Sequence, residues 1–155
     1  MRRRVWPGAA MLILWTSGAI AADADAAFAQ NCVLCHQTGG TGLPGQFPRL
    51  AGRVARISAT PQGRTYLIEL LTYGMTGTIT VDGQEIFGLM PSFAHIPDEQ
   101  LVDLLNYVQS LGDQPRPAPA PFTLDEVKAA RAKPAKSAAE MLEQRQSLGL
   151  DKQVP

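Results

Sequence analysis

Hydrophobic residues recur at near-helical spacing in two central segments of the chain. The first segment follows Thr60-Pro61, an N-cap residue with proline at the first helical position, and ends at Gly74. Its apolar positions are Tyr66, Leu67, Leu70, Leu71 and Tyr73. The second segment opens with Pro97-Asp98-Glu99, whose acidic residues favour a helix N-terminus, and ends at Gly112. Its stripe consists of Leu101, Leu104, Leu105 and Val108. The pattern predicts two amphipathic helices.

An alternating pattern lies between these two helices. Residues 79–87 alternate around the dipeptide Asp82-Gly83, the strongest short-range hairpin signal in the chain. Residues 37–46 hold four glycines and a proline, which predicts a loop. Upstream of that loop, Asp23 or Asp25 can cap a helix that runs through Cys32. We therefore expect an all-α fold with a small β-hairpin.

The C-terminal part of the chain has a different character. Residues 113–122 are rich in proline and alanine, which predicts an extended, fairly stiff linker. In residues 123–155, capping-box patterns at 123–126 and 137–140 predict two helices, separated by Pro134 and ended by Gly149. Their aliphatic residues are too few for an independent core. We expect this two-helix extension to dock on the rest of the chain, on a partner subunit, or only when a partner arrives.

The N-terminus carries an export signal. Met1-Arg2-Arg3-Arg4 precedes an apolar run from Val5 to Ile20, and Ala19-Ile20-Ala21 supplies small residues at the two key cleavage positions. This pattern predicts a signal peptide at residues 1–21, cleaved near Ala21/Ala22, and hence a periplasmic protein. An uncleaved membrane anchor is the alternative, but the apolar run is short for one. Residues 22–112 then form the main domain.

Composition narrows the function classes. The 155 residues include 14 basic and 14 acidic side chains and two cysteines, and 45% are hydrophobic. Two cysteines cannot build a disulfide-dense scaffold, and the absence of net positive charge excludes a nucleic-acid partner. Removal of the three signal-peptide arginines leaves 11 basic against 14 acidic residues, a net charge of about −3.

The two cysteines form one motif, Cys32-Val33-Leu34-Cys35-His36. This spacing is typical of covalent attachment of one c-type haem, in which each thiol adds to a haem vinyl group and His36 becomes the proximal iron ligand. A thioredoxin-like redox pair would require a strand before the motif and a helix after it. A zinc site would require spaced ligands, whereas Cys35 and His36 are adjacent and His95 lies about 60 residues away.

A six-coordinate electron-transfer haem needs a second axial ligand, and a methionine thioether is the usual one when the potential is high. Met90 lies in Gly88-Leu89-Met90-Pro91, where glycine allows close backbone approach and proline stiffens the chain beyond the sulfur. We therefore predict Met90 as the second ligand. Met75 is expected to be a packing residue after the predicted helix, and Met141 to face the core from the extension.

These features resemble the class I monohaem cytochromes c of the bacterial periplasm, over about residues 23–112. Twelve residues after His36, the segment Phe47-Pro48-Arg49-Leu50-Ala51-Gly52 resembles the family's Pro-x-Leu-x-Gly segment. The resemblance implies a cytochrome c fold in which the Pro48 carbonyl accepts a hydrogen bond from Nδ1 of His36. It also implies that Phe28 packs against Tyr107.

Two further groups of side chains bear on the haem. Arg49, Arg53 and Arg56 follow the motif closely, and an arginine there can pair with a haem propionate. Arg53 is our first choice of the three, against the alternative of a solvated basic face. His95, after the Met90 loop, is expected to be a solvent-facing histidine.

The resemblance implies an electron-transfer protein rather than an enzyme. Its expected partners are a periplasmic dehydrogenase, or the catalytic subunit of one, upstream and an oxidase or another cytochrome of the respiratory chain downstream. Membrane association would come only through these partners. Whether the chain is a free carrier or a dedicated haem subunit stays open. The alternatives are a catalytic or ligand-sensing haem protein with an open sixth position, and a thiol oxidoreductase.

Overall fold

The computed structural model describes residues 18–153 and is mostly helical. Residues 1–17, which hold most of the predicted signal peptide, lie outside the described part. The elements in chain order are α1 (Gly18–Asn31), α2 (Val33–His36), the 3-10 turn η1 (Thr38–Gly40), α3 (Arg53–Ile57), α4 (Pro61–Tyr73), β1 (Met75–Val81), β2 (Gln84–Met90), α5 (Asp98–Ser110), α6 (Leu124–Arg131), α7 (Ala138–Ser147) and α8 (Leu150–Gln153). No helix of residues 18–153 is long and apolar enough to cross a bilayer.

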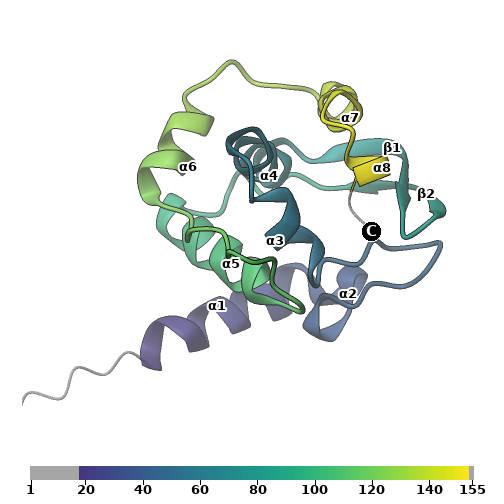
Figure 1. Ribbon diagram of the computed structural model, residues 1–155. Helices are drawn as coiled ribbons and strands as arrows, with labels where there is room; N and C mark the ends of the chain where they lie inside the picture. The colour runs from purple at the N-terminus through teal and green to yellow at the C-terminus, as the bar shows by residue number, and fades with distance from the viewer. Residues whose placement is uncertain (1–17, 154–155) are drawn as a thin grey trace, which may run out of the picture.

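The first and last helices of the main domain, α1 and α5, pack against each other along the lower side of the molecule (Figure 1). The rings of Phe28 and Tyr107 lie 5.3 Å apart between centroids at a tilt of 47°, which confirms the predicted contact. The Tyr107 hydroxyl donates a 2.5 Å hydrogen bond to Asp25 Oδ1 on α1. This crossing places the end of α1, and with it the cysteine motif, against the core.

Helix α4 has the predicted boundaries. The Thr60 side chain accepts a 3.1 Å hydrogen bond from the Gly63 amide, with Pro61 at the first helical position. Gly74 ends the helix at φ +73° and lies so close to the next segment that a Cβ there would approach the Met90 carbonyl oxygen to 2.5 Å. Glycine at this position therefore lets the chain around Met90 pack against the end of α4.

The predicted hairpin is present and longer than the sequence pattern indicated. Strands β1 and β2 pair antiparallel from Met75↔Met90 to Val81↔Gln84. Asp82 and Gly83 turn the chain with φ of +51° and +77°, the left-handed conformations that an Asp-Gly turn supplies. Met75 is thus the first residue of a strand rather than a helix-end residue.

The C-terminal extension packs on the main domain, the first of the three dispositions expected (Figure 1). Both capping boxes are formed, at Thr123 and Ser137. Helix α6 lies on α4 and α5, and α7 lies on α4 and β1. The buried residues that the extension adds to the core are Phe122, Val127, Ala130, Met141 and Leu150.

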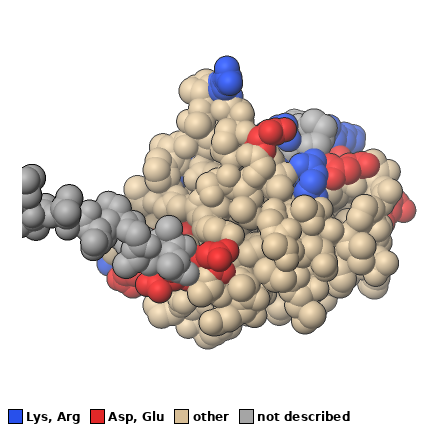
Figure 2. Space-filling model, turned by 90° about the horizontal axis from the view of Figure 1, so that it is seen from below, with Lys and Arg blue, Asp and Glu red and all other residues tan. Residues whose placement is uncertain are grey.

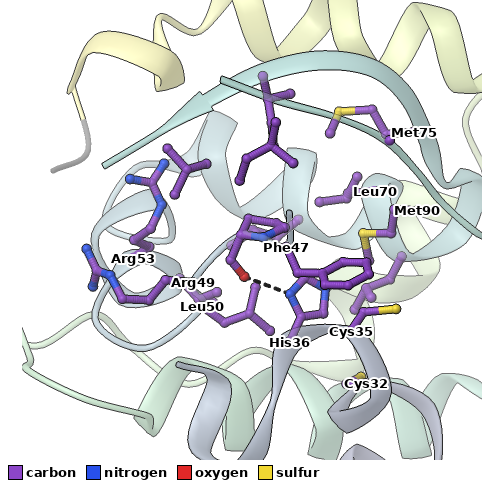
Figure 3. Close-up of a pocket in the computed structure, with 18 of the residues that line it drawn as sticks. Cys32, Cys35, His36, Phe47, Arg49, Leu50, Arg53, Leu70, Met75 and Met90 are labelled. Carbon is purple, nitrogen blue, oxygen red and sulfur yellow. Dashed lines mark hydrogen bonds between the residues drawn. The ribbon is translucent and has the colours of Figure 1, made fainter. Parts of the chain in front are cut away.

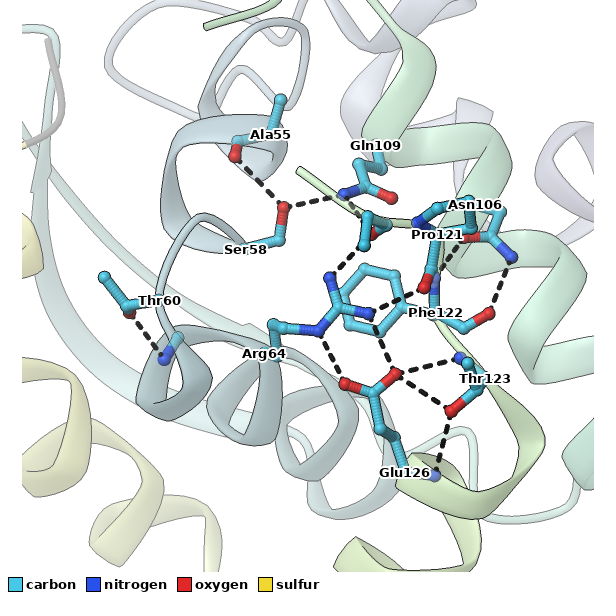
Figure 4. Close-up of polar contacts among 12 residues, drawn as sticks. Ala55, Ser58, Thr60, Arg64, Asn106, Gln109, Pro121, Phe122, Thr123 and Glu126 are labelled. Atoms are coloured by element: carbon cyan, nitrogen blue, oxygen red, sulfur yellow. Dashed lines mark hydrogen bonds and ion pairs between the residues drawn. The ribbon is translucent and has the colours of Figure 1, made fainter. Parts of the chain in front are cut away.

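Polar contacts fasten the start of the extension (Figure 4). Arg64 on α4 donates to Glu126 Oε1 and Oε2 at 2.6 and 2.8 Å, and to the carbonyls of Ala120 and Pro121. Its guanidinium carbon lies 4.2 Å from the centre of the Phe122 ring. One arginine therefore holds both the linker and the first helix of the extension.

Two helix predictions require correction, and one short helix was not predicted. Helix α1 is already formed at Gly18, the first described residue, so neither Asp23 nor Asp25 caps its start. Helix α3 is too short for its periodicity to be recognised in the sequence. Gly149 ends α7 with φ +66°, but a third short helix, α8, follows it in the extension.

Candidate haem site

One cavity of about 460 Å³ lies between α2, α4, the hairpin and α5. This volume is within the range of about 300 to 1,000 Å³ found for small-molecule and cofactor sites. Its walls are mainly aliphatic and aromatic. The predicted site residues Cys32, Cys35, His36, Pro48, Arg53 and Met90 all line it. The fold therefore brings together side chains that are up to 58 residues apart in the sequence.

The cysteine motif forms a tight turn between α1 and α2. The Cys32 amide donates to the Phe28 carbonyl at 2.9 Å, and the His36 amide donates to the Cys32 carbonyl at 2.8 Å. Burial, and secondarily the nearby Cys35 thiol, raises the pKa of Cys32 to about 11. Reactive redox cysteines have a lowered pKa. The Cys32 environment therefore disfavours the thiol oxidoreductase alternative.

His36 is 8% exposed and is fixed by one hydrogen bond. Its Nδ1 lies 2.8 Å from the Pro48 carbonyl oxygen. Because a carbonyl can only accept, Nδ1 carries the proton and Nε2 keeps its lone pair for a metal. Burial lowers the pKa of His36, although the Pro48 contact acts in the opposite direction. The imidazole is therefore held neutral, as a ligand must be.

Met90 ends β2 and is positioned by contacts with α4. The Ser92 hydroxyl donates to the Thr72 carbonyl at 2.6 Å, and the Phe93 amide donates to the Leu71 carbonyl at 2.8 Å. Together with the close approach at Gly74, these bonds fix the backbone at Met90 and directly after it. Figure 3 shows the Met90 sulfur on the same side of the cavity as His36 and Cys35.

Met75 lies opposite Met90 in the hairpin register and also lines the cavity. It is 8% exposed, and its sulfur accepts a 3.6 Å hydrogen bond from the hydroxyl of Tyr66, which is fully buried. The Met75 sulfur is thus a hydrogen-bond acceptor within the core, which agrees with the packing role predicted for this residue. Met141 is fully buried in the extension and does not line the cavity.

The three candidate arginines differ in their surroundings. Arg49 pairs with both carboxylate oxygens of Asp82, at 2.9 and 2.8 Å, and so ties the hairpin turn to the segment after Pro48. Arg53 is 3% exposed and reaches the cavity, 3.6 Å from Asp82. Arg56 is exposed. Arg53 is therefore the candidate whose charge is buried at the cavity.

Arg145 on α7 also lines the cavity, and sequence reasoning missed it. It is 5% exposed although its immediate neighbours on α7 are polar, so no periodic signal marked it as buried. His95 is exposed on the loop after β2, as predicted.

The residues of the cavity fit a covalent haem. The thiols of Cys32 and Cys35 and the imidazole of His36 line the cavity together with the Met90 thioether. Buried guanidinium groups also line it, and these can bind the carboxylates of a haem. An apolar wall suits the macrocycle. The fold and this site together define a small haem protein of the c type.

Comparisons with known proteins agree with this class. A family model described as Cytochrome c matches residues 21–112. The chain is 42% identical over 144 residues to a Cytochrome c-552 of Thermus thermophilus, an alignment that covers 90% of this chain and 96% of the relative. A 30% identity over 83 residues relates it to "Alcohol dehydrogenase (quinone), cytochrome c subunit" of Gluconobacter oxydans, covering 53% of this chain and 16% of the relative. The chain belongs to the cytochrome c family, which binds haem c covalently.

Proposed function

We propose that the chain is an exported electron-transfer cytochrome whose haem is attached at Cys32 and Cys35 and ligated by His36 and Met90. When bound, haem iron carries one electron by alternating between its ferric and ferrous forms. The observation that carries the proposal is the His36 ring, whose Nδ1 is bound by the Pro48 carbonyl and which lines the same cavity as Met90. Two ligands pre-positioned by the fold keep the coordination nearly the same in both redox states.

The protein part of the site has three tasks. Pro48 orients His36 and increases its basicity through the Nδ1 hydrogen bond. The Met90 thioether, held by Gly74 and the Ser92 contact, favours a high potential. The apolar walls exclude water, so that little solvent reorganises with each transfer. None of these tasks makes or breaks a substrate bond, which supports a role as a carrier rather than as an enzyme.

The partners we propose are a periplasmic dehydrogenase, or its catalytic subunit, as electron donor and an oxidase or cytochrome of the respiratory chain as acceptor. The name of the Gluconobacter relative supports the donor side. Export to the periplasm is supported by the predicted signal peptide at residues 1–21. Association with a membrane would then occur through these partners.

The surface around the cavity supports docking of a redox partner. Leu34, Phe87 and Leu89 are 88, 81 and 71% exposed, and the latter two line the cavity mouth. Figure 2 shows the face seen from below, on which a broad area is free of charged side chains while other parts carry both positive and negative groups. Large apolar side chains exposed beside a cofactor cavity are typical of an interaction site.

A catalytic or ligand-sensing haem protein is the alternative class, and it requires an open sixth position. The test is carbon monoxide binding to the purified, reduced protein. We expect one haem per chain that acidic acetone does not extract, a reversible one-electron titration, and slow carbon monoxide binding. Rapid binding together with a high-spin ferric spectrum would support the alternative. Cys32→Ala and Cys35→Ala should each leave a single thioether, which the pyridine haemochrome spectrum reports.

A further inference from the structure

Arg145 connects the C-terminal extension to the cavity. Of the described residues beyond Gly112, it is the one that lines the cavity. Its Nε donates to Asp151 Oδ1 at 2.8 Å, and its Nη2 donates to the Thr80 carbonyl at 3.4 Å. The Thr80 amide in turn donates to Asp151 at 3.2 Å. Strand β1 and helix α8 therefore hold this guanidinium in one place.

The packing of α7 leaves Arg145 little freedom to turn away. A Cβ at Gly77 on β1 would come within 2.5 Å of the Leu142 side chain, so the helix lies directly on the strand. Gly77 has φ of +125°, a conformation that other residues rarely adopt. This close contact brings α7 near enough for Arg145 to reach past β1 into the cavity.

Positive charge gathers at this end of the cavity. Burial, followed by the charge of Arg145, lowers the pKa of Arg53 to about 10, and the Asp82 carboxylate only partly offsets this. Asp82 is already bound by Arg49 through both oxygens. The guanidinium groups of Arg49, Arg53 and Arg145 thus all line this end of the cavity. Arg53 and Arg145 are 3 and 5% exposed, and two buried positive charges on one cavity wall favour an anionic group beside them.

The haem itself supplies anions in the right place. Its two propionates lie on the edge of the ring opposite the vinyl groups that the cysteines bind. Figure 3 shows Arg49 and Arg53 on the side of the cavity away from Cys32 and Cys35. We propose that Arg145, together with Arg53, binds a haem propionate, so that the C-terminal extension forms part of the haem site. This inference rests on the haem position of the proposed function.

A propionate contact has measurable consequences for redox behaviour. A nearby guanidinium stabilises the ionised carboxylate, which lowers its pKa. It also disfavours the ferric form, which carries one more positive charge, and so raises the reduction potential. The potential therefore depends on pH with a step at the propionate pKa. The charged and titratable groups facing this position are Arg49, Arg53, Arg145, Asp82, Asp151 and the Tyr66 hydroxyl.

The experiment measures the reduction potential of the haem-loaded full chain against pH for Arg145→Gln and Arg145→Lys. All proteins carry His95→Gln, which removes the exposed histidine near the Met90 loop. We expect Arg145→Gln to lower the potential and to move the step to higher pH. Arg145→Lys, which keeps the charge, should lie close to the parent protein.

Arg131→Gln is the matched control. Arg131 fastens α6 through Asp98 and the Ile96 carbonyl but does not line the cavity. This variant should loosen the extension without moving the step in the curve of reduction potential against pH. An unmoved step in Arg145→Gln, or an equal shift in Arg131→Gln, overturns the inference.

A second measurement needs no variant. In NMR spectra of the ferrous parent protein, we expect a nuclear Overhauser contact between a propionate methylene and the guanidinium protons of Arg145. Its absence in a fully assigned spectrum overturns the inference even if Arg145→Gln does not fold. Loss of the thioether-iron absorption band in the parent protein would instead contradict the proposed function, so the two failures are distinguishable.

Discussion

Nδ1 of His36 donates a 2.8 Å hydrogen bond to the carbonyl oxygen of Pro48, across 12 residues of glycine-rich loop. The bond fixes both the tautomer and the orientation of the imidazole before any metal is bound. In the proposed site it would also make the ring a stronger donor to iron, because its Nδ1 proton is partly withdrawn. Pro48 therefore acts on the potential through His36.

Replacing Pro48 by alanine tests this relationship. Alanine keeps the carbonyl but removes the ring that stiffens the backbone at this point. We expect a weaker hydrogen bond and a reduction potential raised by at most about 40 mV, the one-electron equivalent of about 1 kcal/mol. Protein-film voltammetry measures the shift. Pro115→Ala, outside the cavity lining, is the control; an equal shift there would show that Pro48 has no specific effect.

The ion pair of Arg64 and Glu126 predicts acid sensitivity. Arg64 lowers the pKa of Glu126 from 4.5 to about 2. The carboxylate therefore stabilises the fold fully above pH 4.5 and loses this contribution as the pH falls towards 2. Because the Glu126 side chain is 35% exposed, we expect Glu126→Gln to cost only about 1 kcal/mol of unfolding free energy at about pH 6.

Urea unfolding at several pH values between about 6 and 2 measures this effect. The difference between parent and Glu126→Gln should shrink as the pH falls below 4.5 and be mostly lost near pH 2, the folded-state pKa of Glu126. Glu85→Gln, which removes an exposed carboxylate from β2, is the control. A difference that stays constant with pH would contradict the ion-pair explanation.

The stability cost of replacing Met141 measures how strongly the C-terminal extension contributes to the core. Its side chain is fully buried between the extension and the main domain. Met141→Ala should lower the unfolding free energy by about 2 to 5 kcal/mol, because it leaves a cavity. Leu89→Ala, on a side chain that is 71% exposed, should cost less than about 0.5 kcal/mol. Denaturant titration followed by circular dichroism gives both values, and similar costs would show that the extension is only loosely attached.

The exposed apolar residues at the cavity mouth predict a kinetic effect. Phe87→Ser combined with Leu89→Ser should slow oxidation by respiratory membranes of the source organism about tenfold, the equivalent of about 1.4 kcal/mol of interface energy. The reduction potential of the same variant is measured alongside, so that a change in driving force is separated from a change in docking. Stopped-flow spectroscopy measures the rate, with Ala129→Ser on the exposed side of α6 as control. Unchanged rates would exclude this surface as the docking site.

Local sequence signals predicted much of the fold. Helix α4 begins after Thr60-Pro61 and ends at Gly74, and the hairpin turns at Asp82-Gly83. Helices α6 and α7 begin at the two capping boxes. Each of these signals is a direct contact between neighbours in the chain, so the sequence alone contains it.

Helix α3 and the burial of Arg145 depend on contacts between distant parts of the chain, and the sequence did not predict them. Helix α3 has five residues, which is too few for a periodic pattern. Arg145 is buried only because α7 lies on β1, where Gly77 admits Leu142. The cysteine motif and the Met90 context predicted most of the candidate haem site, whereas the contribution of the extension required the folded structure.

The central claim is that His36 and Met90 are the two axial ligands. The most direct measurement is the weak ferric absorption band near about 695 nm, which reports a thioether on iron. We predict that the band is present in the parent protein, persists in Met75→Leu and is lost in Met90→Ala, which should then bind carbon monoxide rapidly when reduced. A band that survives in Met90→Ala and disappears in Met75→Leu would contradict the account.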